Sequence, residues 1–291
     1  MQRYGSKKRE ERTIKRIIFL ALAIAIIAPE ARAQQGDGPR QAVIGLTARL
    51  DYYSTYLWRG TYSYGGDGAF LPSLSYDILR TGAVVSFIGE FSESYFFEGE
   101  KSDRNQTAFA AHGLNFGLDY SRTLDSAVTL GAALWYYWYF NSSTSDAANR
   151  TDYTFLMARG YVKMDSVPLT PVLAVNYDYY TAIRRGGDFY VTLGVSHEFA
   201  LADSVSLALS LGAGYYYQNT AKTTTYAGSD VIETPVKKGF SDITALAILK
   251  FSQGRLGISA GFGYIAVPAE TWHKGQDIHR FYATFGASLT L

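Results

Sequence analysis

Charged side chains occupy alternate positions within apolar segments of this chain, and they are the residues with the clearest capacity for chemistry. Successive side chains of a β-strand point to opposite faces, so this spacing would gather the charges on one face and the aliphatic residues on the other. Charges of both signs that face one another can form ion pairs and can also hold water. The set is Arg49, Asp51, Asp77, Glu90, Asp119, Arg159, Lys163, Asp178, Glu198, Asp242, Lys250 and Arg280.

The four histidines give little support for catalysis or metal binding. A hydrolase of the serine type needs a histidine beside its nucleophile and a third polar group that orients it. His112 is the best candidate for that role, but its place near the end of an apolar segment favours an interfacial residue. His197 is better explained as an interfacial residue near a short turn, and His273 and His279 have no spaced carboxylate or cysteine partner for a metal. We expect no catalytic residue, no metal site and no cofactor.

Twelve segments carry the alternation, and the clearest is VTLGAALWYYWYF at 128–140. Its first half has an aliphatic face and a face of small residues, whereas its second half is aromatic on both faces. A tilted strand of ~9–11 residues spans a bilayer, and Trp and Tyr collect where hydrocarbon meets headgroups. The predicted strands are 41–52, 69–79, 83–91, 109–121, 128–140, 152–164, 169–180, 188–199, 205–217, 240–251, 256–266 and 278–291.

The connections between these segments alternate in length. Five short ones, near 80, 123, 165, 202 and 253, are interleaved with six that are mostly longer, and aromatic residues cluster where the odd-numbered segments approach the longer ones. Bacterial barrels have an even number of strands, short periplasmic turns and long external loops, whereas a soluble sandwich has no reason for such clusters. We predict an all-β fold, an antiparallel transmembrane β-barrel of about 12 strands in the outer membrane of a Gram-negative cell.

The first 33 residues predict export. Seven Lys or Arg within the first 16 residues precede the apolar run Ile17–Ala28, and Ala31-Arg32-Ala33 follows as a cleavage pattern. The apolar run is too short for a spanning helix, so we expect a cleaved signal peptide at 1–33 and a barrel domain at 34–291. The long basic segment leaves the true start codon open.

Removal of the signal peptide would change the net charge. Residues 1–33 hold eight Lys or Arg and three Asp or Glu, so the rest holds 19 basic and 23 acidic residues, a formal charge of −4. A mildly acidic exported chain has no electrostatic footprint for nucleic acid. The chain contains no cysteine, which excludes disulfides and thiolate metal sites.

In a closed barrel the aliphatic face meets lipid, and the charged face turns into the lumen. Seven acidic and five basic side chains would then face inward, a slight excess that favours weak cation preference. Aromatic residues of the same parity near the outer mouth could stack on sugars or nucleobases, but plugging the mouth or bracing the loops is the favoured interpretation. They are Trp135, Tyr137, Tyr139 and Tyr216.

The last eight residues, TFGASLTL, resemble a barrel-assembly signal, with a polar residue, a glycine two positions later and apolar residues near the end. These are Thr284, Gly286, Leu289 and Leu291, and the aromatic final residue usual in such signals is replaced by leucine. Any amphipathic last strand would look similar. We expect outer-membrane lipid and the barrel-assembly machinery as partners.

The stretch YYSTYLWRG followed by FLPSLSYDI resembles the start of the TorF-like porins, an outer-membrane family of unassigned role. The residues that carry the resemblance are Tyr56, Trp58, Arg59, Gly60, Pro72 and Tyr76. The resemblance covers about 40 residues. It implies a barrel and transport without a defined substrate.

Three classes of function remain open. A narrow channel for small hydrophilic solutes is favoured, because 12 strands fall between small packed barrels and open 16-stranded porins. A structural or adhesive barrel with a lumen closed by ion pairs is the main alternative. An outer-membrane enzyme is the least supported, since no site constellation is visible.

Overall fold

The structure is a computed structural model. It describes residues 45–59, 61–62, 68–78, 81–93, 112–124, 127–140, 153–180, 185–218, 222–225, 231–234, 238–268 and 278–291. Within these ranges, no helix is long and apolar enough to cross a membrane.

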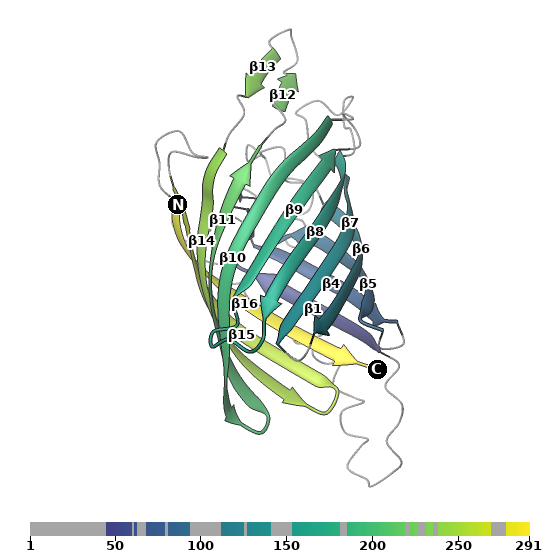
Figure 1. Cartoon of the computed structure of the whole chain (residues 1–291), viewed down its shortest axis with the longest axis vertical. Helices are drawn as coiled ribbons and strands as arrows, with labels where there is room; N and C mark the ends of the chain where they lie inside the picture. Colours follow the sequence, from purple (N-terminus) through teal and green to yellow (C-terminus); the bar gives the residue numbers. More distant parts are fainter. Residues whose placement is uncertain are drawn as a thin grey trace, which may run out of the picture.

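Twelve antiparallel strands form one closed barrel, as the sequence predicts. Each strand pairs with its neighbour in the chain, and β1 closes the ring by pairing with β16 (Figure 1). The barrel strands are β1 (Leu46–Tyr53), β4 (Ala69–Asp77), β5 (Ala83–Ser92), β6 (His112–Leu124), β7 (Val128–Phe140), β8 (Tyr153–Met164), β9 (Val172–Tyr180), β10 (Arg185–Ala202), β11 (Val205–Tyr217), β14 (Lys238–Gln253), β15 (Leu256–Val267) and β16 (Ile278–Thr290).

The outside of the barrel is apolar. Leu134, Leu193 and Phe281 expose 52%, 60% and 65% of their surface, and they belong to the aliphatic and aromatic parity of their strands. Exposed apolar surface on this scale is unfavourable in water and is expected of a face that meets hydrocarbon. Where both neighbours are present, a closed ring leaves no strand edge, so the backbone polar groups find partners within the sheet. At the short-turn end β10 runs beyond its pairing with β9, which ends at Gly194.

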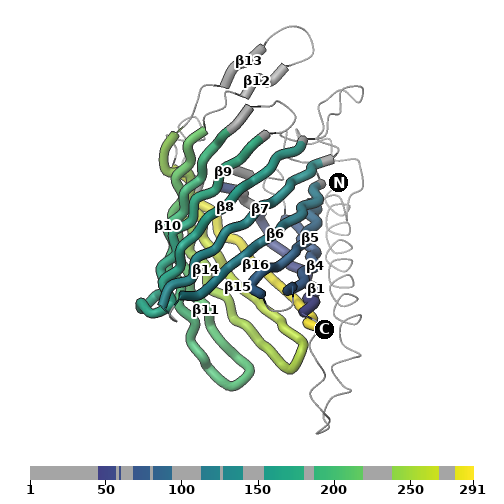
Figure 2. The backbone as a smooth tube through the Cα atoms, turned by 45° about the vertical axis from the view of Figure 1, so that its right-hand side comes forward, coloured from purple at the N-terminus to yellow at the C-terminus, as the bar shows by residue number. Residues whose placement is uncertain are grey.

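The two ends of the barrel differ. At one end the strands are joined by short turns, such as those at 203–204 and 254–255, and the other end carries the longer connections. The β10–β11 and β14–β15 hairpins extend furthest at the short-turn end (Figure 1 and Figure 2). Two short hairpins were not predicted: β2 (Leu57–Trp58) with β3 (Thr61–Tyr62), and β12 (Lys222–Thr225) with β13 (Val231–Thr234).

Six of the twelve predicted strand starts, at 41, 109, 152, 169, 188 and 240, differ from the structure by one to five residues. The strand predicted from 169 begins at Val172, because Leu169 and Thr170 have φ values of 66° and 37° and extend the turn. Pro171 then lacks the N–H that a ladder would use. The strand predicted from 41 begins at Leu46, and residues 41–44 lie outside the described part of the chain.

Candidate functional site

The twelve predicted charged residues share one face of the sheet. Cross-strand partners point to the same side, and the register links Arg49 with Ser288, Asp119 with Ala133 and Lys250 with Ser206. The remaining members of the set follow the same alternation on their own strands. This is the face opposite to the exposed apolar side chains.

Arg59 identifies that face as the interior. It belongs to the connection between β1 and β4, yet its side chain contacts Asp178 on β9, which lies halfway round the ring from β1. A side chain can join opposite walls only through the lumen. Arg59 also has a φ of 50°, a left-handed conformation that is uncommon for a residue with a Cβ and marks a constrained position.

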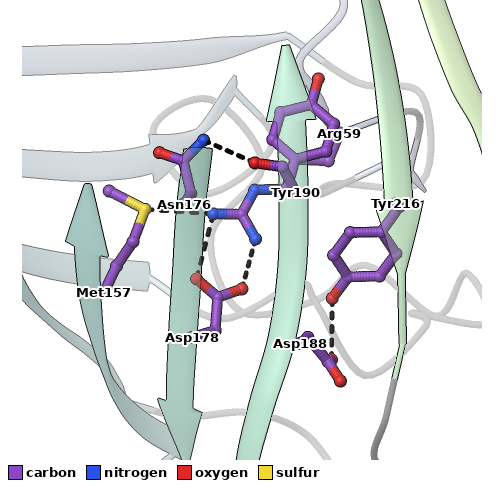
Figure 3. A network of polar contacts seen from close by, with 7 residues as sticks. All are labelled: Arg59, Met157, Asn176, Asp178, Asp188, Tyr190 and Tyr216. Atoms are coloured by element: carbon purple, nitrogen blue, oxygen red, sulfur yellow. Dashed lines mark hydrogen bonds and ion pairs between the residues drawn. The ribbon is translucent and has the colours of Figure 1, made fainter. Parts of the chain in front are cut away.

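The guanidinium of Arg59 is held by three kinds of contact (Figure 3). Its Nη1 and Nη2 donate hydrogen bonds to the two carboxylate oxygens of Asp178, with Nη2 at 3.0 Å from Oδ1. Nη2 lies 3.0 Å from the sulfur of Met157. The carbon Cζ lies 4.9 Å from the ring centroid of Tyr190 and 5.9 Å from that of Tyr216. A bidentate pair with two cation–π contacts holds both the position and the plane of the group.

Burial makes this ion pair different from a surface one. The side chains of Arg59 and Asp178 are 7% and 2% exposed. Burial lowers the pKa of Arg59, but the charge and hydrogen bonds of Asp178 outweigh it, so the pKa is raised and the guanidinium stays protonated. Removing one partner would leave a buried charge without its counter-ion, which is strongly destabilising.

Two further carboxylates fix the tyrosines that flank Arg59. The hydroxyl of Tyr216 donates to Asp188 at 2.8 Å, and the hydroxyl of Tyr190 donates to Asp242 at 3.0 Å. The side chains of Asp188 and Asp242 are nearly fully buried. These bonds hold the two rings at an interplanar angle of 64°, so that both contact the guanidinium.

An aromatic stack continues the same layer around the wall. Tyr137 and Phe155 stack with centroids 4.5 Å apart and planes 3° apart, and Tyr139 and Trp135 extend the stack along β7. Tyr137 is 5% exposed. Its ring is therefore packed against neighbouring rings, so the sugar-stacking role considered for Tyr137 has little surface to use.

Polar contacts tie this stack to the neighbouring strands. Asn115 donates to Glu90 at 2.5 Å, and the hydroxyl of Tyr139 lies 3.4 Å from both carboxylate oxygens of Glu90. Trp135 donates from Nε1 to Asp119 at 3.4 Å. We call this level of the lumen, with the Arg59 contacts and the aromatic stack, the closed half.

The interior near the short turns is different, and we call it the open half. Its charges form pairs along the wall: Lys250 with Glu198 at 2.6 Å and Lys163 with Asp165 at 2.6 Å. The Lys250 and Glu198 side chains are 40% and 50% exposed although they face inward. Hydrogen bonds from Lys163 and Thr129 lower the pKa of Asp165 in its turn.

The remaining predicted charges also lie on the inward face of the wall. Arg49 pairs with Asp51 at 2.6 Å, and the Cζ of Arg159 lies 5.4 Å from the ring centroid of Tyr161. Asp77 lies near the short-turn end, where its Oδ1 is buried and has no hydrogen-bond partner among the described residues. The fourth mouth aromatic, Tyr216, contacts Arg59 as described, and Arg280 lies on the interior parity of β16 near its start.

The histidines stack on aromatic residues where their side chains are described. His197 packs edge-on against Phe199, and His279 lies beside Tyr264 with Nδ1 at 2.5 Å from the hydroxyl. The His112 side chain and His273 lie outside the described part. Within the described ranges, no group of three or more His, Cys, Asp or Glu could hold a metal.

The predicted assembly residues belong to the strand that closes the ring. Thr284 and Gly286 lie opposite Tyr53 and Asp51 of β1, and Leu289 lies opposite Ala48. The N–H of Leu291 donates to the carbonyl of Leu46 at 2.8 Å. These contacts describe the folded barrel, and recognition by the assembly machinery stays a prediction.

Several residues of the closed half were not predicted. Asn115, Asn176, Asp188 and Tyr190 share the charged parity of their strands, but only charged residues and mouth aromatics of that parity were predicted to line the lumen, and these four were not among them. In the sequence, Arg59 was noted only as one of the residues that resemble the TorF-like family. Its position in the lumen was not predicted, because strand periodicity says nothing about how a connection folds.

No family model and no curated protein sequence matches this chain. Among solved structures, LpxR from Salmonella typhimurium has a TM-score of 0.51 at 8% identity, covering 84% of this chain and all of that one, 100%. An outer membrane channel from Pseudomonas putida F1 has a TM-score of 0.48 at 11% identity, covering 88% of this chain and 100% of that chain. The NanC porin has a TM-score of 0.45 at 11% identity, covering 84% of this chain and 100% of that chain. At these identities the likeness to LpxR shows the fold alone, so the chain is a closed antiparallel β-barrel of the outer-membrane type.

Proposed function

We propose that this protein is a narrow channel of the outer membrane for small hydrophilic solutes. The observation that carries the proposal is the exposure of inward-facing charges in the open half. Lys250 and Glu198 remain 40% and 50% exposed on the inward parity at the short-turn end, where β10 runs beyond its pairing with β9, so solvent reaches charged side chains at this mouth of the barrel. A water-filled, charged interior enclosed by an apolar exterior is the construction of a porin.

The closed half supports a narrow passage. The connection from β1 brings Arg59 across to β9, and the aromatic stack on β7 and β8 lies in the same layer. Solutes would therefore meet one constriction lined by carboxylates, tyrosines and a single guanidinium from that connection. Small polar solutes would pass more readily than bulky ones, and the acidic excess favours cations over anions.

Planar-bilayer recording tests the proposal. Purified, folded protein should give discrete current steps whose reversal potential in a salt gradient shows weak cation preference. The control is the same preparation after heat denaturation, which should give none. The absence of steps from folded protein at several voltages and salt concentrations would contradict the channel.

The packed Arg59 layer favours a second candidate, a structural or adhesive barrel whose lumen is closed. In that case neither the native protein nor a variant that releases Arg59 conducts. Recording both proteins separates the two candidates, because a narrow channel conducts in the native state and more strongly after release.

A further inference from the structure

The walls around Arg59 form a complete recognition site for a planar cation. Four consecutive strands, β8 to β11, contribute Met157, Asp178, Tyr190 and Tyr216, all on the lumen face (Figure 3). We call these four residues the guanidinium cage. Arg59, which occupies it, comes from the opposite side of the ring through a connection.

The cage is held in shape by the sheet. Met157 is opposite Asp178, and Tyr190 is opposite Tyr216 in the strand register. Asn176 donates from Nδ2 to the carbonyl of Tyr190 at 3.1 Å, and the two tyrosine hydroxyls are bound by Asp188 and Asp242. None of these bonds uses Arg59. A preformed site keeps its geometry when its occupant leaves, which favours binding of a replacement.

The chemistry of the cage matches a guanidinium group. Asp178 accepts from both terminal nitrogens, a fork that suits the planar guanidinium better than a compact ammonium. Two tyrosine faces provide cation–π attraction, which gains strength in a desolvated site. Meanwhile Arg59 adopts a left-handed backbone with a φ of 50°, so its occupancy carries a conformational cost that a free ligand would not bear.

We propose that the cage binds guanidinium-bearing solutes and that Arg59 is a tethered competitor that occupies it. This inference rests on the proposed channel for its transport meaning. A solute bearing a guanidinium group would take the place of the Arg59 side chain in the cage. Guanidinium compounds are then ligands of the constriction.

Binding of ethylguanidinium to folded protein in detergent, followed by calorimetry, tests the cage without relying on current. Arg59→Ala should bind one equivalent at least about tenfold more tightly than the native protein, whose cage is occupied. Adding Asp178→Asn should weaken the affinity of Arg59→Ala by about tenfold or more, as expected for a lost charged hydrogen-bond pair. Ethylammonium should bind Arg59→Ala more weakly than ethylguanidinium.

Two further variants serve as a control for specificity and as a substitute in case Arg59→Ala does not fold. Arg159→Ala removes another lumen arginine outside the cage and should create no ethylguanidinium site. Arg59→Gly suits the positive φ and replaces Arg59→Ala if the latter does not fold. The cage proposal is overturned if a folded Arg59 variant binds ethylguanidinium no better than the native protein does. It is also overturned if adding Asp178→Asn to that variant leaves its affinity for ethylguanidinium unchanged.

Current recordings on the same variants separate the two proposals. If Arg59→Ala conducts and ethylguanidinium neither binds to it nor blocks its current, the proposal of a guanidinium-binding cage is wrong, and the proposal of a channel is supported. If ethylguanidinium binds Arg59→Ala with the Asp178 dependence but no variant conducts, the cage stands and the channel is wrong.

Discussion

The closed and open halves of one lumen use charge in opposite ways. In the closed half Arg59 and Asp178 are 7% and 2% exposed, and neighbouring carboxylates are held by tyrosine hydroxyls. In the open half Lys250 and Glu198 pair at 2.6 Å yet stay 40% and 50% exposed. Both halves contain ion pairs, so burial decides the role of the inward-facing charges. The buried pair holds Arg59 in place, whereas the exposed pairs at the short-turn end stay in contact with solvent.

The largest expected effect is on stability, from Asp178→Ala. The variant leaves the Arg59 guanidinium in a buried site without its counter-ion, and we expect a loss of about 3 kcal/mol in the free energy of unfolding. Urea unfolding in lipid vesicles, followed by tryptophan fluorescence, measures it. Lys163→Ala is the matched change in the open half and should cost much less, because its pair with Asp165 is solvated. Equal losses for the two variants would remove the distinction between the halves.

A smaller loss is expected when a side chain is added beneath a lumen ring. A Cβ at Gly117 would lie 2.5 Å from the indole of Trp135, whereas at Gly160, on the outward face of β8, nothing lies within 4 Å. Gly117→Val should therefore cost about 1–3 kcal/mol through overpacking, and Gly160→Val should be nearly neutral. The same unfolding experiment compares them. A neutral Gly117→Val would mean that the aromatic stack is loosely packed.

The smallest expected effect concerns ion preference. Lys250→Ala removes one solvated cation from the open half, so the permeability ratio of cations to anions should rise by less than about twofold in physiological salt, where screening is strong. The reversal potential in a salt gradient measures this ratio. A shift toward anions would contradict the inward placement of Lys250.

The sequence was sufficient for the barrel wall because its signal is local. Alternation predicted β7 as 128–140, the range that the structure has, and put Lys250 and Glu198 on one face. The start of β9 was wrong because turn conformations at Leu169 and Thr170 depend on backbone angles that the pattern does not record.

The contact between Arg59 and Asp178 could not be predicted, for a physical reason. The Arg59–Asp178 contact joins residues 119 positions apart across the ring, and it depends on how a connection folds after the barrel has closed. A bulge raises the same difficulty: Ser241 is an extra residue between the paired positions Phe240 and Asp242, so strict alternation misplaces it.

The absence of native cysteine allows a direct test of the two halves by thiol labelling. Ser210 on β11 faces the open half and is exposed, whereas Ser241 on β14 is 0% exposed in the closed half. A charged, water-soluble maleimide should label Ser210→Cys at least about a hundredfold faster than Ser241→Cys, and Arg59→Ala should accelerate only the latter. Equal labelling rates at the two positions in the otherwise native protein would contradict a lumen divided by Arg59.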